Sequence, residues 1–276
     1  MPAKKTTKAA STSTFTEVEA YDWGQEETTG FESTNQSDLG IPFLQIIQSG
    51  SPELDKKHDD HLTKKIEGIQ EGDIINSLTR EILSVTEEDP MAFIPCYSEK
   101  LFPEFKPRGA GGGFVQVHRD ESILTQCKRD DKNKDVLQSG AGAGNQIITT
   151  HYLYGYAQNA AGDWEQVIVG MTSTQLKHAR RFLNMARSIK MNGKSVPLFA
   201  NVYNLHTKVE KNTEGSWMGW DFSVNRMLNP NNPDDKTLVM DARDSAKAFR
   251  EQAESLRLGG KSKTIEEKDD EDRGLF

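Results

Sequence analysis

The sequence contains no apolar run long enough to cross a bilayer. Of its 276 residues, 35% are hydrophobic, and no segment approaches the roughly 18–20 consecutive apolar residues that a transmembrane helix needs. Residues 1–17 carry lysines but lack the apolar centre of a secretory signal. These absences predict a cytoplasmic protein without a membrane partner.

Cysteine is scarce. The chain has two, Cys96 and Cys127, and neither belongs to a C-x-x-C pair. Two cysteines are too few for a disulfide framework, so we expect two free thiols in a reducing compartment. A single disulfide or a metal site are the alternatives.

Catalytic and cofactor motifs are also lacking. The Gly-rich loops at 108–114 and 139–145 have no Gly-Lys-Ser/Thr, so we interpret them as hairpin loops rather than phosphate loops. His58 and His61 have no further ligands at a metal-site spacing and are predicted to lie in a solvated loop. We expect no catalytic residue, metal or cofactor. A nuclease holding a metal with Asp130 and Asp131 is the enzyme alternative.

Acidic residues are absent from one long segment, although the net charge of the chain is −8. Between residues 166 and 209 there is no Asp or Glu. The bases of this segment are Lys177, Arg180, Arg181, Arg187, Lys190, Lys194 and Lys208. Residues 265–276 reverse the pattern, with six acids against Lys268 and Arg273. Blocks of opposite charge predict a basic body and an acidic tail that complements it. We expect this tail to compete with DNA for the basic groove of the body.

What the sequence does contain is a series of short β-rich runs. They lie at 41–47, 72–85 (two strands around a turn), 91–98, 113–119, 146–158, 165–171, 197–209 and 216–224. A Gly-containing interruption at 159–163 predicts a hairpin. Many short strands separated by turns favour a β-barrel or sandwich over a βαβ sheet.

Two segments have helical periodicity. Residues 173–193 place Leu176, Phe182 and Ala186 on one face and basic side chains on the other, with Ser173 or Thr174 as N-cap and Asn192-Gly193 as the end. A second helix is predicted at about 234–258. Residues 1–38 are polar and aperiodic, so we expect a disordered arm.

Aromatic side chains accompany the basic zone. Alternation places Tyr152, Tyr154 and Tyr156 on one strand face, and leaves Trp217 outside the core face of its strand. Rings on which bases stack, beside cations that follow the phosphates, are typical of sequence-tolerant single-strand binding. Alternatively, the tyrosines cover a sheet face beneath a helix, and the cations are a solvated helix surface.

The tail and parts of the body resemble a known class. The ending DDEDRGLF is similar to the acidic C-terminal tip of bacterial and phage single-stranded DNA-binding proteins. The segments IPFLQIIQSGSPEL, FKPRGAGGGF and MTSTQLKHARRF resemble phage proteins with this role. The resemblance implies an OB-type barrel, sequence-tolerant binding of single strands, and a tail that recruits replication and recombination proteins.

Together these patterns predict a mainly β (α+β) chain. We expect a disordered arm (1–38), an OB-like domain (39–228) with one packed basic helix, a C-terminal helix and linker (229–260), and a disordered acidic tail (261–276). If a phage encodes the chain, its compartment is the host cytoplasm. The expected partners are single-stranded DNA and replication or recombination proteins, and a homodimer is one option for the assembly.

Each group of candidate residues has one predicted role. Phosphate contacts are assigned to Lys106, Arg108, Lys177, Arg180, Arg181, Arg187 and Lys190. Base stacking is assigned to Phe114, Tyr152, Tyr154, Tyr156 and Trp217. Partner binding is assigned to Asp269, Asp270, Glu271, Asp272, Leu275 and Phe276. The alternatives are a strand-annealing recombination protein, and a scaffold in which basic helix and acidic tail pair between subunits.

Overall fold

A computed structural model of the chain describes residues 40–83, 87–131, 133–213 and 215–258. The chain divides into two compact units, 1–40 and 41–276, and the account below concerns the second. The predicted N-terminal arm and the acidic tail both lie outside the described residues. None of the helices in the described part combines the length and apolarity needed to cross a bilayer.

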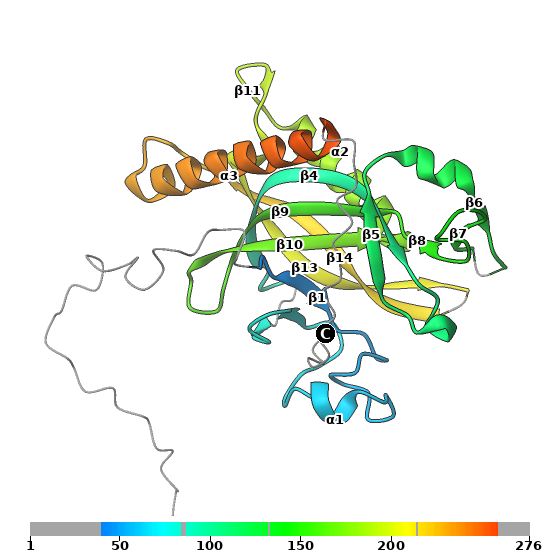
Figure 1. Cartoon of the computed structure of the whole chain (residues 1–276). Coiled ribbons are helices and arrows are strands. Elements are labelled where there is room, and N and C mark those ends of the chain that lie inside the picture. The colour runs from blue at the N-terminus through cyan, green and yellow to red at the C-terminus, as the bar shows by residue number, and fades with distance from the viewer. Residues whose placement is uncertain (1–39, 84–86, 132, 214, 259–276) are drawn as a thin grey trace, which may run out of the picture. The chain divides into compact units, whose positions relative to one another are not determined.

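Strands dominate the described residues, as predicted (Figure 1). The strands of the main sheet are β1 (Phe43–Ile46), β2 (Ile74–Asn76), β3 (Ile82–Leu83), β4 (Met91–Phe105), β5 (Phe114–His118), β6 (Cys127–Arg129), β7 (Asp135–Leu137), β8 (Gln146–Ile147), β9 (Thr150–Gln158), β10 (Trp164–Thr172), β13 (Asn201–Asn212) and β14 (Gly215–Met227). The helices are α1 (His61–Lys64), α2 (Leu176–Ser188) and α3 (Pro233–Leu258). The chain is therefore mainly β with a few helices.

The long strand β4 joins two groups of strands. Its N-terminal part pairs with β13 and β9, and its C-terminal part pairs with β5 and β8. We predicted that this strand would end at residue 98, but it continues to Phe105. A bulge between Pro95 and Tyr97 interrupts the register of β4 with β9, and an extra residue bends a strand and increases its twist.

The first group of strands encloses the main hydrophobic core. The strands follow the order β14-β13-β4-β9-β10-β1, and β1 runs parallel to β10. Phe93, Leu153, Val169 and Leu205 point into the core and are fully buried. The helix α2 contributes Phe182, whose ring contacts the ring of Tyr203 at a centroid distance of 5.0 Å.

Backbone pairing does not close this sheet into a ring within the described residues. One open edge of the described sheet is β14, and two glutamine side chains cover it. The Gln48 amide donates to the Met218 carbonyl and accepts from the Met218 N–H, both at 2.9 Å. Gln175 accepts from the Trp220 N–H at 2.9 Å. An exposed strand edge invites pairing with another chain, so these amides take the place of the missing strand neighbour.

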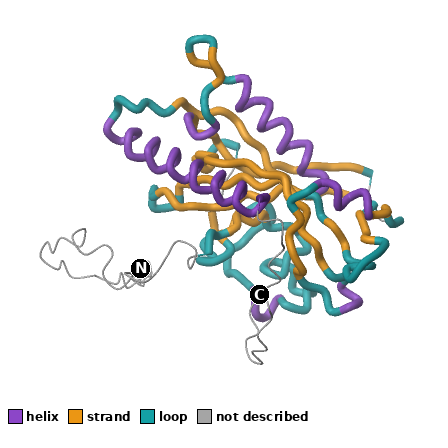
Figure 2. Tube along the Cα trace, turned by 45° about the horizontal axis from the view of Figure 1, so that its top comes forward, coloured by secondary structure: helices purple, strands orange, loops and turns teal. Residues whose placement is uncertain are grey.

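The helix α3 lies on the opposite face of the sheet from the main core (Figures 1 and 2). Its fully buried Ala242 packs in a second cluster with Ile94, Cys96 and Val202. The N-terminal end is held by Asp235, which accepts two hydrogen bonds from the Arg226 guanidinium at 2.7 and 2.8 Å. The predicted second helix is thus confirmed with nearly the predicted bounds.

The predicted C-terminus of the first helix, at Asn192-Gly193, is wrong. The helix α2 ends at Ser188 and is followed by a separate hairpin of β11 (Lys190–Met191) and β12 (Lys194–Ser195). Asn192 and Gly193 both have positive φ, 52° and 77°, which is the pattern of a type I′ turn. The residues expected to terminate the helix therefore form the tip of a hairpin. The expected cap is also absent, because Gln175 is the N-cap residue and makes no capping hydrogen bond.

Candidate functional site

The outer face of α2 carries most of the predicted phosphate contacts. Arg180 and Arg187 are exposed, and neither forms an ion pair with another described residue. Lys177 donates a hydrogen bond to Glu210, and Arg181 lies 3.5 Å from Asp221. We call these four residues (Lys177, Arg180, Arg181 and Arg187) the basic stripe of α2. Arg180 and Arg187 have no acidic partner among the described residues, and carboxylates neutralise Lys177 and Arg181.

The acids that neutralise the stripe come from β13 and β14. Lys208 donates to Asp221 at 2.8 Å, so Asp221 serves both Lys208 and Arg181. Burial opposes ionisation of Asp221, but the Lys208 hydrogen bond and charge outweigh it and lower the pKa of this carboxyl. The hydrogen bond from Lys177 is the main cause that lowers the pKa of Glu210. Both carboxylates are therefore ionised at neutral pH.

The same acidic pair has two buried histidines beside it. His178 Nε2 lies 3.1 Å from a Glu210 carboxylate oxygen, and His206 Nε2 lies 3.9 Å from Asp221. Burial is the leading cause that lowers the pKa of His178, which favours the neutral ring at physiological pH. No group of three or more potential ligands suitable for a metal ion occurs among the described residues.

The other three predicted phosphate contacts do not lie on α2. Lys190 belongs to β11 rather than to the helix, and it is exposed. Lys106 is exposed just after β4, and its N–H donates to the Gly113 carbonyl at 2.9 Å. Arg108 begins a short 3₁₀ turn, and its side chain lies outside what the structure describes. The predicted phosphate contacts thus come from several separate elements.

Trp217 is the predicted stacking residue that lies nearest the α2 stripe. It is half-buried and stands opposite Glu210 in the β13–β14 register. Because Glu210 binds Lys177, the indole shares a neighbour with the basic helix. The indole N–H is buried without a partner among the described residues. Phe114 lies on β5 instead, 57% exposed, with its ring 5.8 Å from that of Phe105.

The three tyrosines share one face of β9, as predicted, but α3 covers much of that face. The Tyr156 hydroxyl lies 2.8 Å from the Ser245 hydroxyl of α3. The Tyr154 ring lies 5.0 Å from the Phe249 ring, centroid to centroid. Tyr152 contacts Phe43 at the start of β1, at 6.1 Å. Tyr154 and Tyr156 are therefore covered by a helix, as the alternative to base stacking predicted. The covering helix is α3 and not the basic helix α2.

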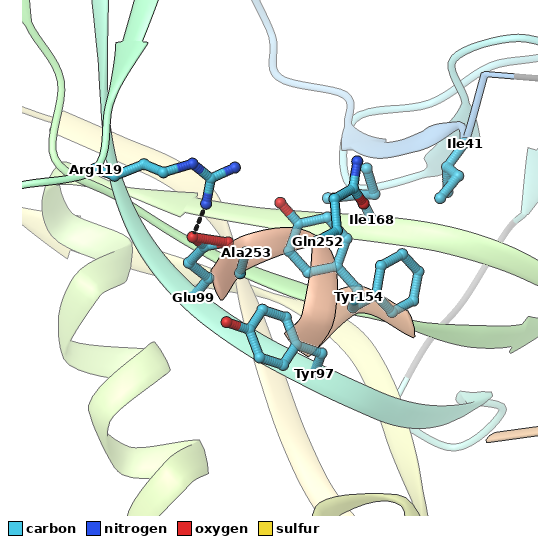
Figure 3. Close-up of a pocket in the computed structure, with 9 residues that line it drawn as sticks. Ile41, Tyr97, Glu99, Arg119, Tyr154, Ile168, Gln252 and Ala253 are labelled. Carbon is cyan, nitrogen blue, oxygen red and sulfur yellow. Dashed lines mark hydrogen bonds and ion pairs between the residues drawn. The ribbon is translucent and has the colours of Figure 1, made fainter. Parts of the chain in front are cut away.

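A pocket of about 250 Å³ remains beside the C-terminal part of α3 (Figure 3). Tyr97, Tyr154 and Phe249 line it with aromatic surface. Its polar wall is an ion pair between Arg119 and the buried Glu99. Burial is the main cause that raises the pKa of Tyr154, so this hydroxyl is protonated at neutral pH. The pocket combines planar apolar walls with one charged pair.

A buried carboxylate, Glu104, connects β4 to the strands of the second group. It is 1% exposed and accepts hydrogen bonds from Asn145 at 2.6 Å and Gln116 at 2.9 Å, and its other neighbour is His118 Nε2 at 2.7 Å. Burial would raise the pKa of Glu104, but these three contacts together lower it. Glu104 is therefore ionised, and it links β4 to β5 and to Asn145. We call residues 106–145 the lobe that these contacts hold in place.

The remaining sequence candidates occupy ordinary positions. Cys96 and Cys127 are free thiols, as expected, and burial raises the pKa of Cys96 to about 12. Asp130 and Asp131 are exposed in the turn between β6 and β7. His61 differs from the prediction of a solvated loop, because its ring is buried and its Nδ1 lies 2.8 Å from the Pro52 carbonyl.

Several residues that shape the site were missed by sequence reasoning. They are Glu210 and Asp221, which neutralise part of the stripe, Ser245 and Phe249, which cover the tyrosines, and the Glu99–Arg119 pair. The apolar spacing of residues 234–258 predicted that this helix packs against the body of the protein. No sequence signal indicated which face of the sheet it covers. The predicted partner-binding residues, Asp269 to Asp272, Leu275 and Phe276, lie outside the described residues.

Comparison with known proteins gives one match. The model of a family described as Pam3 phage gp34-like protein matches residues 8–255. Neither the curated proteins nor the solved structures gave a match. The matched range contains every described strand and most of α3, and the name of the family suggests a phage origin. On the extent of this match, the chain belongs to the Pam3 phage gp34-like protein family.

Proposed function

We propose that this chain is a sequence-tolerant single-stranded DNA-binding protein of phage replication or recombination, built on an OB-like barrel. The observation that carries the proposal is the pair Arg180 and Arg187, exposed on α2 inside a 44-residue segment without acids and without an acidic partner among the described residues. An ordinary exposed helix mixes charges for i,i+4 pairing. Here the nearest acids come from other elements and reach only Lys177 and Arg181.

The strand order supports the OB-like assignment. In chain order β4, β9, β10, α2, β13 and β14 form a meander, a helix and a hairpin, with β13 paired to β4. An OB fold is a five-stranded, partly open Greek-key barrel. The Gln48 and Gln175 side chains bridge the place where such a barrel would close. The extra parallel strand β1 occupies the gap beside β10.

This arrangement suggests a path for the DNA. OB folds bind oligonucleotides on the face of their second and third strands and with the loops that follow the first and fourth. In this chain α3 covers much of the β9–β10 face. We therefore assign the phosphate contacts to the α2 stripe and the first stacking contact to Trp217, near the β13–β14 loop. The tyrosine face becomes available to bases when α3 moves away from it.

A fluorescence titration with dT oligonucleotides at two salt concentrations tests the proposal. Binding should quench tryptophan emission, and each neutralised phosphate should lower the slope of log K against log salt by about 0.7. The double variant Arg180→Ser/Arg187→Ser should lose affinity and flatten that slope. Lys236→Ser/Arg250→Ser, two exposed positions on α3, is the matched control and should bind as wild type. No oligonucleotide affinity, with salt-dependent self-association, would refute the proposal in favour of a scaffold.

A further inference from the structure

The β11–β12 hairpin is a second surface with its own chemistry. It forms a two-stranded sheet that pairs with no other described strand, and it projects from the body beyond α2 (Figure 1). Its two-residue turn, Asn192-Gly193, has the positive φ values that match the twist of a tight hairpin. The tip therefore has a defined backbone conformation, although it makes no cross-strand contact with the main sheet.

The side chains of this hairpin are unusual for a connecting turn. Met191 is 56% exposed and pairs with Lys194, while Lys190 pairs with Ser195. Paired residues of an antiparallel hairpin point to the same side, so one face carries Met191 with Lys194 and the other carries Lys190. The lysines are exposed, and no acid occurs within the surrounding 166–209 segment. The hairpin is a cationic ribbon with an apolar group near its tip.

Charge and shape together select the ligand. A cationic ribbon complements a polyanion, and two-stranded β-ribbons are among the elements that proteins insert into DNA grooves. Apolar side chains, Met included, are used as wedges against base steps, where they unstack the bases. Lysines on opposite faces suit phosphates on two strands that diverge around the ribbon. Single-stranded DNA alone would use one face.

We propose that the β11–β12 hairpin recognises the junction between single- and double-stranded DNA. Met191 inserts into the terminal base step of the duplex and unstacks it, and Lys190 and Lys194 contact the two diverging backbones. The proposal rests on the proposed function, which assigns a phosphate contact to Arg187 near the end of α2, three residues before the hairpin. It adds a preference for a particular DNA structure to otherwise sequence-tolerant binding.

The test compares an oligonucleotide with the same oligonucleotide extended by a duplex, carrying 2-aminopurine at the terminal base pair. Wild type should bind the tailed duplex about tenfold more tightly, or about 1.4 kcal/mol, because the phosphate contacts of Lys190 and Lys194 outweigh the cost of unstacking. The 2-aminopurine emission should rise because Met191 unstacks the labelled base. Met191→Ser should lose both effects and keep its affinity for the single strand. Met240→Ser, at another exposed methionine (45%) on α3, should behave as wild type.

A second variant separates the contribution of the lysine charges from that of the Met191 side chain. Lys190→Ser/Lys194→Ser should bring the salt slope on the tailed duplex close to that on the single strand, while Lys236→Ser should not. The proposal is overturned if wild type shows no preference for the junction, or if the preference persists in both hairpin variants. Failure of the proposed function looks different, because wild type would then not bind the single strand. Junction binding without single-strand binding would support the hairpin and reject the proposed function.

Discussion

The ring of Phe249 in α3 lies over the ring of Tyr154 in β9, with the centroids 5.0 Å apart. The contact holds an aromatic side chain of the strand face beneath a helix of the same chain. We therefore predict that Phe249→Ala increases oligonucleotide affinity, because the vacated surface becomes available to a base and each stacked base contributes about 1–3 kcal/mol. The variant should also unfold more easily, by less than the roughly 3–5 kcal/mol typical of a fully buried Phe.

Oligonucleotide titration and urea unfolding check this prediction. Met240→Ala, an exposed position on the same helix, controls for a general loss of helix stability and should change neither property. Unchanged affinity in a destabilised Phe249→Ala protein would show that the tyrosine face takes no part in binding.

The network around Asp221 and Glu210 leads to a second prediction. Asp221→Asn frees Arg181 and Lys208, and Glu210→Gln frees Lys177. Each freed cation can contact a phosphate, so affinity for oligonucleotides should rise and the salt slope should steepen by up to about 0.7 per cation. Titrations at four salt concentrations give the slope. Glu67→Gln, at an exposed residue of a distant loop, is the control, and equal slopes in all three variants would contradict the prediction.

Removal of the acidic segment gives a third prediction. A chain without residues 265–276 loses six acids and two bases. We propose that this acidic segment competes with DNA for the basic stripe of α2. We expect tighter binding to single strands with less sensitivity to salt, and loss of any partner that reads the tail. Replacing the six acids by Asn and Gln at full length separates charge from length. Binding no tighter than that of the full chain at any salt concentration would refute the competition.

The sealed edge of β14 can be tested through stability. Gln48→Ala removes two hydrogen bonds to the Met218 backbone, and each is worth about 0.5–1.5 kcal/mol. We expect a loss of about 1–3 kcal/mol in the free energy of unfolding, together with faster amide exchange at Met218. Gln45→Ala, an exposed residue of the neighbouring strand β1, should be nearly neutral. A Gln48 variant with wild-type stability would show that the Gln175 hydrogen bond is enough to hold this edge.

The lowered pKa of Glu104 leads to a prediction of how the stability of the fold changes with pH. Its folded-state pKa lies below the ordinary value of 4.5, so the carboxylate stabilises the fold fully at neutral pH. That contribution is lost as pH falls through 4.5 toward the folded-state pKa. The difference in unfolding free energy between wild type and Glu104→Gln should therefore shrink from pH 7 to pH 3. Urea titrations at several pH values measure it, and a constant difference would contradict the assigned role.

Sequence patterns located most strands because buried residues alternate along them. Leu153, Gly155 and Ala157 alternate in β9 with the tyrosines, and all three are buried. The extension of β4 could not be predicted in this way, because it contains Pro103 and the charged Lys100 and Glu104. Those residues disfavour a strand, and they are satisfied here by partners far along the chain.

The turn at Asn192-Gly193 shows a different limit. Asn-Gly ends helices and also forms type I′ turns, so the residues alone fit both structures. The choice is made by the pairing of Lys190 with Ser195. Likewise, the stripe on α2 was visible in the sequence, but its partial neutralisation was not. Glu210 and Asp221 lie 33 and 40 residues from the cations that they bind, well beyond the range of helical periodicity.

The shared strand β4 also makes part of the chain separable. The polypeptide leaves β4 after Phe105 and returns to pair with it at Gln146, and these two residues are paired neighbours. Residues 106–145, with β5, β6 and β7, therefore behave as an insertion whose entry and exit lie side by side. A tight turn from Phe105 to Gln146 can replace this lobe without rerouting β9, β10, β13 or β14. The rest of the sheet can thus stay fixed while the lobe diversifies.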